Sequence, residues 1–119
     1  MRYMWHSTDM NNLLSIMNKG LLPMNAEKTV YLAETESDAL KFSVLRGYDV
    51  TVTLKIKIYK RDEANVFETF DHSYDYFRCK AFGYDGVIPI ENIIPYKYYN
   101  TAAVMSELRQ KRMRSKEEV

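Results

Sequence analysis

The sequence predicts an α+β fold with a mostly antiparallel sheet and short helices at its periphery, and three patterns support this prediction. Between Asp49 and Lys60, apolar and polar residues alternate with the period of two expected of a half-buried strand. Residues 9–20 and 35–47 each begin with helix-capping side chains and end at a glycine. The other strand-like runs are short and are separated by turn residues, which antiparallel connections tolerate.

The size and composition indicate one globular domain over residues 1–119. Of its residues, 46% are hydrophobic and 28% are charged, which is typical of folded soluble proteins and not of disordered chains. The formal net charge is only +1, which argues against a strongly electrostatic grip on a nucleic-acid backbone, although local patches remain compatible with it.

The chain has a single cysteine, Cys79, which excludes an intrachain disulfide and gives no metal-ligand spacing. The first residues lack the charged-then-apolar pattern of a signal peptide, and no apolar run approaches the roughly 18 residues that a bilayer span requires. We therefore expect a cytoplasmic protein without a metal and without a membrane partner.

The first element is a short strand from Tyr3 to His6. Tyr3 and Trp5 fall on one face and Met4 and His6 on the other, because successive side chains of a strand point in opposite directions. His6 is therefore expected at the end of the strand, facing one defined side.

A helix is expected next, with Thr8 or Asp9 accepting hydrogen bonds from its first free N–H groups and Gly20 at its end. After a polar turn, Val30–Ala33 reads as a second short strand, with Tyr31 inside it. A second helix follows, capped by Thr35 or Ser37 and closed near Gly47; its apolar positions are Ala39, Leu40 and Phe42.

The alternating stretch after Asp49 is the clearest strand of the sequence. Its apolar side chains are expected on the core: Val50, Val52, Leu54, Ile56 and Ile58. The intervening side chains are expected to form a mixed, partly basic outer face: Thr51, Thr53, Lys55, Lys57 and Tyr59.

The second half of the chain is harder to assign. Arg61–Tyr76 fits a loop, an edge strand or a turn of helix, and Tyr74–Phe82 fits a short helix. Gly83–Gly86 resembles a turn, since two glycines and an aspartate suit unusual backbone angles. Val87–Ile90 and Ile93–Tyr99 read as one bent strand or two joined strands.

Two prolines in that last region, Pro89 and Pro95, argue for an edge strand or a bulge, because proline donates nothing to a ladder. From Thr101 to Met113 the composition is helical, with a narrow apolar stripe at Val104, Met105 and Leu108. The basic residues of this region are interleaved with glutamates, which favours a solvated face over a docking surface: Arg109, Lys111, Arg112 and Arg114.

Three residues are candidates for chemistry: His6, Tyr31 and Glu91. Each also has an ordinary structural interpretation. A lone histidine is more often a paired structural group, a strand tyrosine is usually core packing, and Glu91 beside Asn92 fits the solvated corner of a bend. The order and local context of the three favour a shared site.

In that order and context the chain resembles the ADP-ribosyltransferase superfamily, whose members place a histidine, a tyrosine and an acidic residue on three strands around a split NAD cleft. Trp5–Leu22 is similar to the His-x-Thr, Asn-Leu, Ile, Gly-Leu signature of DNA-modifying ADP-ribosyltransferase toxins and of RNA 2′-phosphotransferases. Val30–Ala33 with the helix positions Ala39 and Phe42 resembles the second block. Gly83–Glu91 resembles the turn and strand before the catalytic acid.

The resemblance implies a role for each matching residue. His6 would hydrogen-bond the adenosine-side ribose and phosphates of NAD, with Ser7 or Thr8 beside the nicotinamide end. Tyr31 would stack on the nicotinamide ring, and Phe42 belongs to the same cofactor-binding set. Glu91 would bind the nicotinamide ribose and stabilise the oxocarbenium-like sugar, as an anion aimed at developing positive charge does.

Some positions depart from the family pattern. Glu91 is followed by Asn92 and soon by Pro95, so it fits a bend as well as a cleft strand, and Asp85 is the alternative acid. Pro89 stands where many protein-targeting members carry an acid or a glutamine, which argues against arginine as the acceptor.

The function expected from this resemblance is transfer of ADP-ribose from NAD to a macromolecular acceptor, protein or nucleic acid, in a toxin or a phage-encoded effector. Two alternatives remain open: a non-catalytic binding or inhibitor module that keeps the fold, and an RNA 2′-phosphotransferase-like activity. The enzyme hypothesis predicts that His6, Tyr31 and Glu91 converge on one concave pocket.

Overall fold

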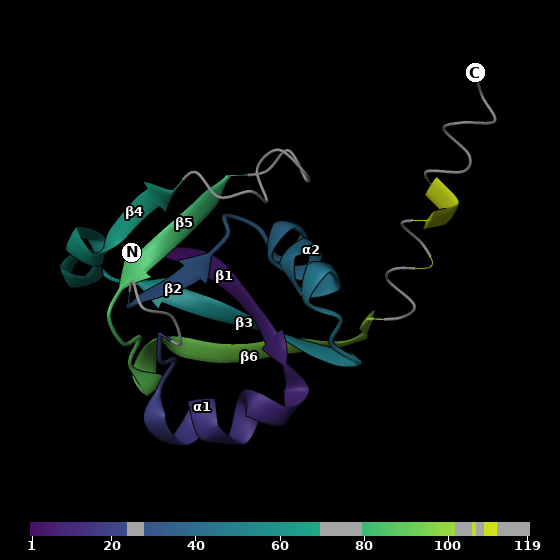
Figure 1. Ribbon diagram of the computed structural model, residues 1–119. Coiled ribbons are helices and arrows are strands. Elements are labelled where there is room, and N and C mark those ends of the chain that lie inside the picture. Colours follow the sequence, from purple (N-terminus) through teal and green to yellow (C-terminus); the bar gives the residue numbers. More distant parts are fainter. Residues whose placement is uncertain (24–27, 70–79, 102–105, 107–108, 112–119) are drawn as a thin grey trace.

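The computed structural model describes residues 1–23, 28–69, 80–101, 106 and 109–111. Its strands form two antiparallel three-stranded sheets (Figure 1). The first sheet has the order β1 (Arg2–Asp9), β3 (Val50–Ile58), β6 (Ile93–Asn100). The second has the order β2 (Thr29–Leu32), β5 (Ala81–Asp85), β4 (Val66–Thr69). An α+β fold with antiparallel sheets is thereby confirmed.

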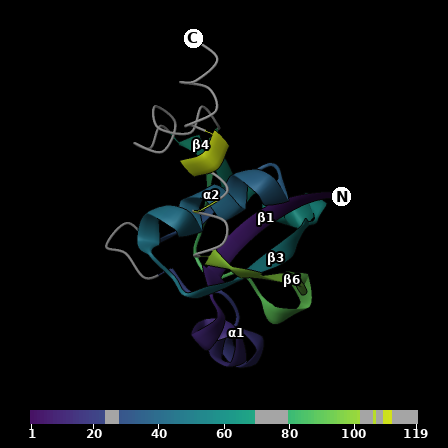
Figure 2. The ribbon, with the colours of Figure 1, turned by 90° about the vertical axis from the view of Figure 1, so that its right-hand side faces the viewer.

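Short helices surround the sheets, and α1 and α2 lie on different sides of β1, β3 and β6 (Figure 2). The two α-helices are α1 (Leu13–Lys19) and α2 (Glu36–Arg46). The 3-10 helices are η1 (Met10–Asn12), η2 (Lys60–Asn65) and η3 (Ile90–Asn92). In the part of the chain that the structure describes, none of these helices has the length and apolar character needed to cross a membrane.

The two sheets touch through one backbone bridge. The Trp5 amide donates to the Ala33 carbonyl at 2.9 Å, and the Ala33 amide donates to the Trp5 carbonyl at 2.8 Å. A second isolated bridge joins Leu21 to Ile88. Apart from the bridge between Trp5 and Ala33, β1 pairs with β3 and β2 pairs with β5, so β1 and β2 diverge beyond it.

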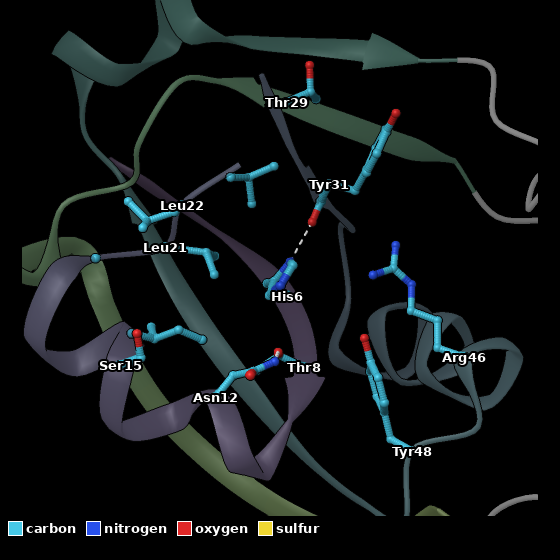
Figure 3. Close-up of a pocket in the computed structure, with 13 residues that line it drawn as sticks. His6, Thr8, Asn12, Ser15, Leu21, Leu22, Thr29, Tyr31, Arg46 and Tyr48 are labelled. Carbon is cyan, nitrogen blue, oxygen red and sulfur yellow. Dashed lines mark hydrogen bonds between the residues drawn. The ribbon is translucent and has the colours of Figure 1, made fainter. Parts of the chain in front are cut away.

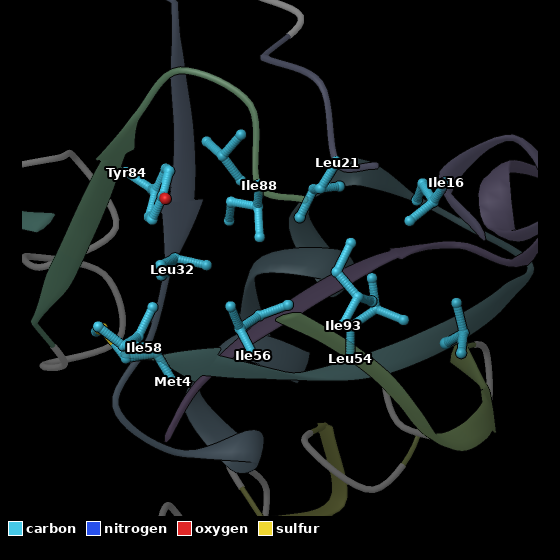
Figure 4. Close-up of a cluster of buried hydrophobic side chains, with 12 residues drawn as sticks. Met4, Ile16, Leu21, Leu32, Leu54, Ile56, Ile58, Tyr84, Ile88 and Ile93 are labelled. Atoms are coloured by element: carbon cyan, nitrogen blue, oxygen red, sulfur yellow. The ribbon is translucent and has the colours of Figure 1, made fainter. Parts of the chain in front are cut away.

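The hydrophobic core lies between the two sheets, where Leu32 and Tyr84 of one face Met4, Ile56 and Ile58 of the other (Figure 4). The other buried members of the core cluster are Ile16, Leu21, Val30, Val52, Leu54, Ile88 and Ile93. The even-numbered apolar positions of β3 from Val52 to Ile58 are fully buried, as its alternation predicts. The prediction was wrong for Val50, which begins the strand and is 42% exposed.

The opposite face of β3 is only half exposed, which differs from the prediction of an outward polar face. Thr51 and Thr53 are fully buried, and Thr53 Oγ1 donates to a Glu36 carboxylate oxygen of α2 at 2.8 Å. On the neighbouring strand, Ser7 Oγ donates to the Ala39 carbonyl, also of α2. These small hydroxyl side chains let the helix approach the sheet and still find hydrogen-bond partners. Only the half of this face around Lys55 and Lys57 stays partly exposed.

The predicted strand from Tyr3 to His6 was too short, because β1 continues to Asp9. The predicted cap at Asp9 is confirmed, although it begins the 3-10 helix η1 and α1 follows only at Leu13. The Asp9 carboxylate then accepts from the Asn11 amide at 2.9 Å and caps η1. Gly20 ends α1 with a φ of +85°, and a Cβ there would stand 2.6 Å from the Ile88 carbonyl oxygen. The glycine is therefore required both by its backbone angle and by the bridge beside it.

The boundaries of α2 follow the sequence closely. The Asp38 amide donates to Thr35 Oγ1 at 3.1 Å, which is the predicted N-cap. Gly47 closes the helix in the left-handed conformation with a φ of +69°.

The predicted turn at Gly83–Gly86 was wrong for its first three residues, which belong to β5. Gly83 is a glycine because a Cβ would lie 2.8 Å from Thr29 Cγ2 and closer still to the Phe67 ring, so the reason is crowding between strands. Only Gly86 turns, with a φ of +94°. The predicted helix over 74–82 is contradicted at Ala81 and Phe82, which are strand; residues 74–79 lie outside the described residues.

The predicted strand at Val87–Ile90 was wrong: Ile88 makes one isolated bridge, and η3 begins at Ile90 after Pro89. The expectation from Pro95 is confirmed. β6 is an edge strand, and its register with β3 shifts between Thr53 and Leu54, where Pro95 and Lys97 are the partners. Arg61–Tyr76 fitted a loop, an edge strand or a turn of helix, and its described residues form most of η2 and the edge strand β4. Residues 101, 106 and 109–111 are helical, while Val104, Met105, Leu108, Arg112 and Arg114 lie outside the described residues.

A buried polar cluster joins η2 to β5 and η3. One Asp62 carboxylate oxygen accepts from the Tyr84 hydroxyl at 3.0 Å. The other accepts from the Tyr59 amide at 3.0 Å and from Asn92 Nδ2 at 2.9 Å. Asn92 Nδ2 also donates to the Lys57 carbonyl at 2.9 Å. Asn92 is thus an internal anchor of the turn that carries Glu91.

Candidate functional site

A cavity of about 520 Å³ lies where β1 and β2 diverge, which is within the range of about 300–1,000 Å³ of small-molecule sites (Figure 3). We call it the cleft. Its lining comes from β1, the α1 region, β2 and the end of α2: His6, Thr8, Asn12, Ser15, Ile16, Gly20, Leu21, Leu22, Thr29, Val30, Tyr31, Arg46 and Tyr48. Figure 3 shows Arg46 and Tyr48 on one side and the residues of β1 and α1 on the other.

His6 joins the two strands at the point where they separate. Its Nδ1 donates to the Tyr31 carbonyl at 2.7 Å. Alternate residues of a strand direct their backbone groups to the same side, so Tyr31 points its carbonyl toward β1, as Ala33 does. Ala33 still finds a backbone partner there, whereas Tyr31 receives the imidazole. The His6 side chain thus satisfies this backbone carbonyl on the side where β1 and β2 separate.

The charge state of His6 follows from its surroundings. The pKa of the imidazole is lowered from 6.5 to about 4, mainly because the ring is buried. The bond to Tyr31 opposes this shift, and the positive charge of Arg46 adds to it. At pH 7 the ring is therefore neutral. Because Nδ1 carries the proton that it donates to Tyr31, Nε2 is the unprotonated nitrogen and is a hydrogen-bond acceptor.

The electrostatic character of the cleft comes from Arg46. Among the lining residues in the described ranges, Arg46 is the one with a formal charge at pH 7, and none is Asp or Glu. It lies in the last turn of α2, and its side chain is exposed. A positive guanidinium beside a neutral imidazole and several hydroxyl groups favours an anionic ligand such as a phosphate ester.

Of the cofactor-binding residues predicted from sequence, Thr8 and Tyr31 line the cleft with His6, whereas Ser7 and Phe42 do not. Thr8 Oγ1 accepts from Asn12 Nδ2 at 3.3 Å. Ser7 lies on the other face of β1, where it contacts α2 and accepts from Ser43 Oγ at 2.7 Å. Ser7 and Thr8 are neighbours in the sequence motif, but they lie on opposite faces of β1 because side chains alternate along a strand.

The two candidate acids also lie outside the cleft. Glu91 is in η3 with a side chain that is 68% exposed, and it forms an ion pair of 3.1 Å with Arg61. Asp85 is exposed at the end of β5, opposite Thr29 in the strand register. The structure therefore brings together His6, Tyr31 and Thr8 and does not place Glu91 with them.

Sequence reasoning missed Arg46 and Tyr48. Arg46 carries one weak signal, because it immediately precedes the glycine that ends α2, but nothing local indicates that this end of the helix faces His6. Tyr48 is one of ten tyrosines and has no distinguishing pattern around it.

A scan against protein-family models and a search of curated proteins gave no match. Within the described ranges, no group of three or more His, Cys, Asp or Glu side chains is placed to hold a metal ion.

The low pKa of His6 predicts a specific pH dependence of stability. Between about 4 and 6.5 the unfolded chain binds a proton at His6 that the folded chain does not. The contribution of His6 to the free energy of unfolding should thus be fully present above pH 6.5. It should fall as the pH decreases toward 4, by on the order of 2 kcal/mol. Urea unfolding over this range measures it.

The matched variant for this measurement is His6→Asn, which keeps an N–H donor for Tyr31 but does not titrate. Other groups titrate in both proteins, so the difference between the two pH profiles isolates His6. Parallel profiles would show that the imidazole is not held neutral by the fold.

Proposed function

We propose that this protein transfers ADP-ribose from NAD to a macromolecular acceptor, with the cleft as the NAD site and the two sheets as the halves of an ADP-ribosyltransferase-like split sheet. One observation carries the proposal. His6 and Tyr31, to which the sequence resemblance assigns NAD contacts, lie 25 positions apart yet line one cavity at the divergence of two antiparallel sheets.

The cleft offers complementary groups for three parts of NAD: the diphosphate, a ribose and the nicotinamide. The Arg46 guanidinium suits the diphosphate, because its planar fork matches phosphate oxygens. The unprotonated Nε2 of His6 suits a ribose hydroxyl, which can donate to it. Tyr31 and Tyr48 supply aromatic rings for the nicotinamide.

The reaction breaks the bond between the nicotinamide nitrogen and the ribose carbon, and nicotinamide leaves with the electron pair. The acceptor forms the new bond at that carbon, and a protonated acceptor releases its proton to solvent. As the sugar acquires positive charge, an anion near it lowers the barrier. Glu91 lies outside the cleft, so this proposal gives it no part in that stabilisation; an anionic acceptor can supply the charge itself.

Glu91→Gln therefore separates two versions of the mechanism. Because Glu91 is exposed in η3, we expect the variant to bind NAD and to release nicotinamide within about twofold of the unaltered protein. Substitutions of exposed side chains usually change the free energy of unfolding little. NAD binding is measured by calorimetry and nicotinamide release by chromatography. Asp85→Asn is tested in parallel.

A loss of about a hundredfold in transfer at unchanged NAD affinity would instead assign the catalytic acid to the altered position, as expected of a group that acts in the transition state. The function itself is tested by mass spectrometry of candidate acceptors after incubation with NAD. Bound NAD without any modified product would indicate a binding module, and absence of NAD binding would overturn the proposal.

The second candidate is an RNA 2′-phosphotransferase-like activity. It is favoured by the charge of the cleft, whose described lining has an arginine and no carboxylate. A phosphorylated acceptor would be attracted by that charge, whereas an arginine or lysine acceptor would be repelled. Loss of phosphate from a 2′-phosphorylated oligonucleotide, dependent on NAD, distinguishes this candidate.

A further inference from the structure

The outer face of the β1-β3-β6 sheet has an open half that α2 does not cover. Six side chains define this open sheet face: Tyr3, Trp5, Lys55, Lys57, Tyr96 and Lys97. They come from all three strands and combine aromatic rings with ammonium groups. Ile94, which pairs with Lys55 in the register and is 37% exposed, lies among them. We propose that the open sheet face binds single-stranded nucleic acid, with bases stacked on the rings and phosphates held by the lysines.

The aromatic rings are accessible and already ordered. The Trp5 and Tyr96 rings meet edge to face, with centroids 5.0 Å apart and planes at 70°. Tyr96 is 47% exposed and Tyr3 is 40% exposed, while Trp5 is partly exposed. Rings that are held in place lose little freedom when a base stacks on them, and each such contact is worth about 1–3 kcal/mol.

The lysines lie among these rings. Lys55 Nζ is 4.2 Å from the centroid of the Tyr3 ring and 5.8 Å from that of Trp5. Lys97 Nζ is 5.3 Å from the Tyr96 ring. None of the three lysines of this face pairs with a carboxylate of the described residues. Their charges are therefore available to phosphates.

Two of the neighbouring acids pair with arginines, Glu63 with Arg2 and Glu91 with Arg61. Glu36 accepts from the hydroxyls of Thr53 and Tyr99, and Glu34 is exposed beside the bridge of Ala33 to Trp5. The open sheet face itself has three lysines and no carboxylate, although the whole chain has a net charge of only +1. Lysine is depleted in the centre of protein–protein interfaces, so this mixture favours nucleic acid over a protein partner.

Accessible aromatic rings favour a single strand over a duplex, whose bases are already stacked and whose faces are hidden. The face is separate from the cleft: none of its six residues lines that cavity. The inference goes beyond the proposed function and does not depend on NAD, so either can fail without the other.

Trp5 makes the proposal directly measurable, because it is the sole tryptophan of the chain. A base stacked on its ring should quench its fluorescence. The probes are oligothymidylate and oligouridylate of about 12 nucleotides, a length that covers one single-strand site. We expect saturable quenching by the single strands, weaker binding to a duplex of equal length, and no effect of added NAD on the titration.

Two variants and two matched controls test the face. Tyr96→Ala should weaken binding about tenfold, as loss of one stacking partner does. Lys55→Gln with Lys97→Gln should lower the dependence of log affinity on log salt by about 1.4, since each phosphate contact with a single strand contributes about 0.7. The aromatic control is Tyr98→Ala, because Tyr98 is 60% exposed but pairs with Val52 in the sheet register. The lysine control is Lys19→Gln with Lys41→Gln.

The proposal is supported if the face variants lose binding and salt dependence while both controls keep them. It is overturned by absence of Trp5 quenching with either oligonucleotide, by equal affinity for single strand and duplex, or by equal losses in the controls. Quenching by anionic phospholipid vesicles but not by oligonucleotides would also overturn it and would identify a membrane surface as the ligand. Circular dichroism of Tyr96→Ala checks its fold, and the double lysine variant tests the face independently.

Discussion

Replacing Arg46 with glutamine is expected to weaken NAD binding by about 10- to 100-fold. Arg46 is the cation of the cleft, and a hydrogen bond to a charged partner contributes about 1.5–3 kcal/mol. Glutamine keeps a similar length and a donor but has no charge. Calorimetric titration with NAD measures the loss, and the same loss is expected for ADP-ribose because the diphosphate is common to both.

Arg61→Gln is the matched control for this variant. Arg61 is also an exposed arginine, but it pairs with Glu91 outside the cleft, so its replacement should leave NAD affinity unchanged. Arg46→Lys separates charge from geometry, since lysine keeps the positive charge but not the planar fork. Equal NAD affinity of Arg46→Gln and the unaltered protein would remove the diphosphate from this side of the cleft.

The parts of the fold that sequence predicted correctly are those fixed by local chemistry. The alternation after Asp49 specifies one buried face of β3, and Thr35 and Gly47 set the limits of α2 through caps that need no distant partner. Pro95 indicates an edge strand with an irregular register because it lacks an N–H. Each of these signals acts within a few residues.

The errors arose where a distant element decides the outcome. Thr51 and Thr53 look like solvent-facing residues until α2 lies across them. Gly83 looks like a turn residue, but it is required by the close approach of Thr29 and Phe67 from two neighbouring strands. The residue pattern of one segment does not indicate which distant segment will pack against it.

The residues of the candidate site also fall into those that the local sequence indicates and those that depend on distant packing. His6 and Tyr31 are recognisable because each has a characteristic local context, and the bond between them follows from the direction of the Tyr31 carbonyl. Arg46 reaches the cleft only through the packing of α2 against β1. Glu91 follows a motif, but Asn92 beside it is anchored inward by Asp62 and Lys57, and Glu91 is left on the outside.

That anchor leads to the largest expected effect on stability. Asp62→Ala should lower the free energy of unfolding by about 3 kcal/mol, because it removes the acceptor of three donors: the Tyr84 hydroxyl, the Tyr59 amide and Asn92 Nδ2. Asn92 keeps its bond to the Lys57 carbonyl and Tyr84 keeps a contact of 3.4 Å with Asn65, which limits the loss. Denaturant titration measures the change.

Glu63→Ala tests whether this effect comes from burial. Glu63 is the next residue of η2, but it lies on the surface in an ion pair with Arg2, and exposed pairs contribute between about 0 and 1 kcal/mol. If Asp62→Ala and Glu63→Ala were equally mild, the polar cluster would not hold η2 and η3 to the sheets. If only Asp62→Ala is severe, the buried carboxylate is the group that fixes the turn before β6, because it alone joins Tyr59, Tyr84 and Asn92 across three segments of the chain.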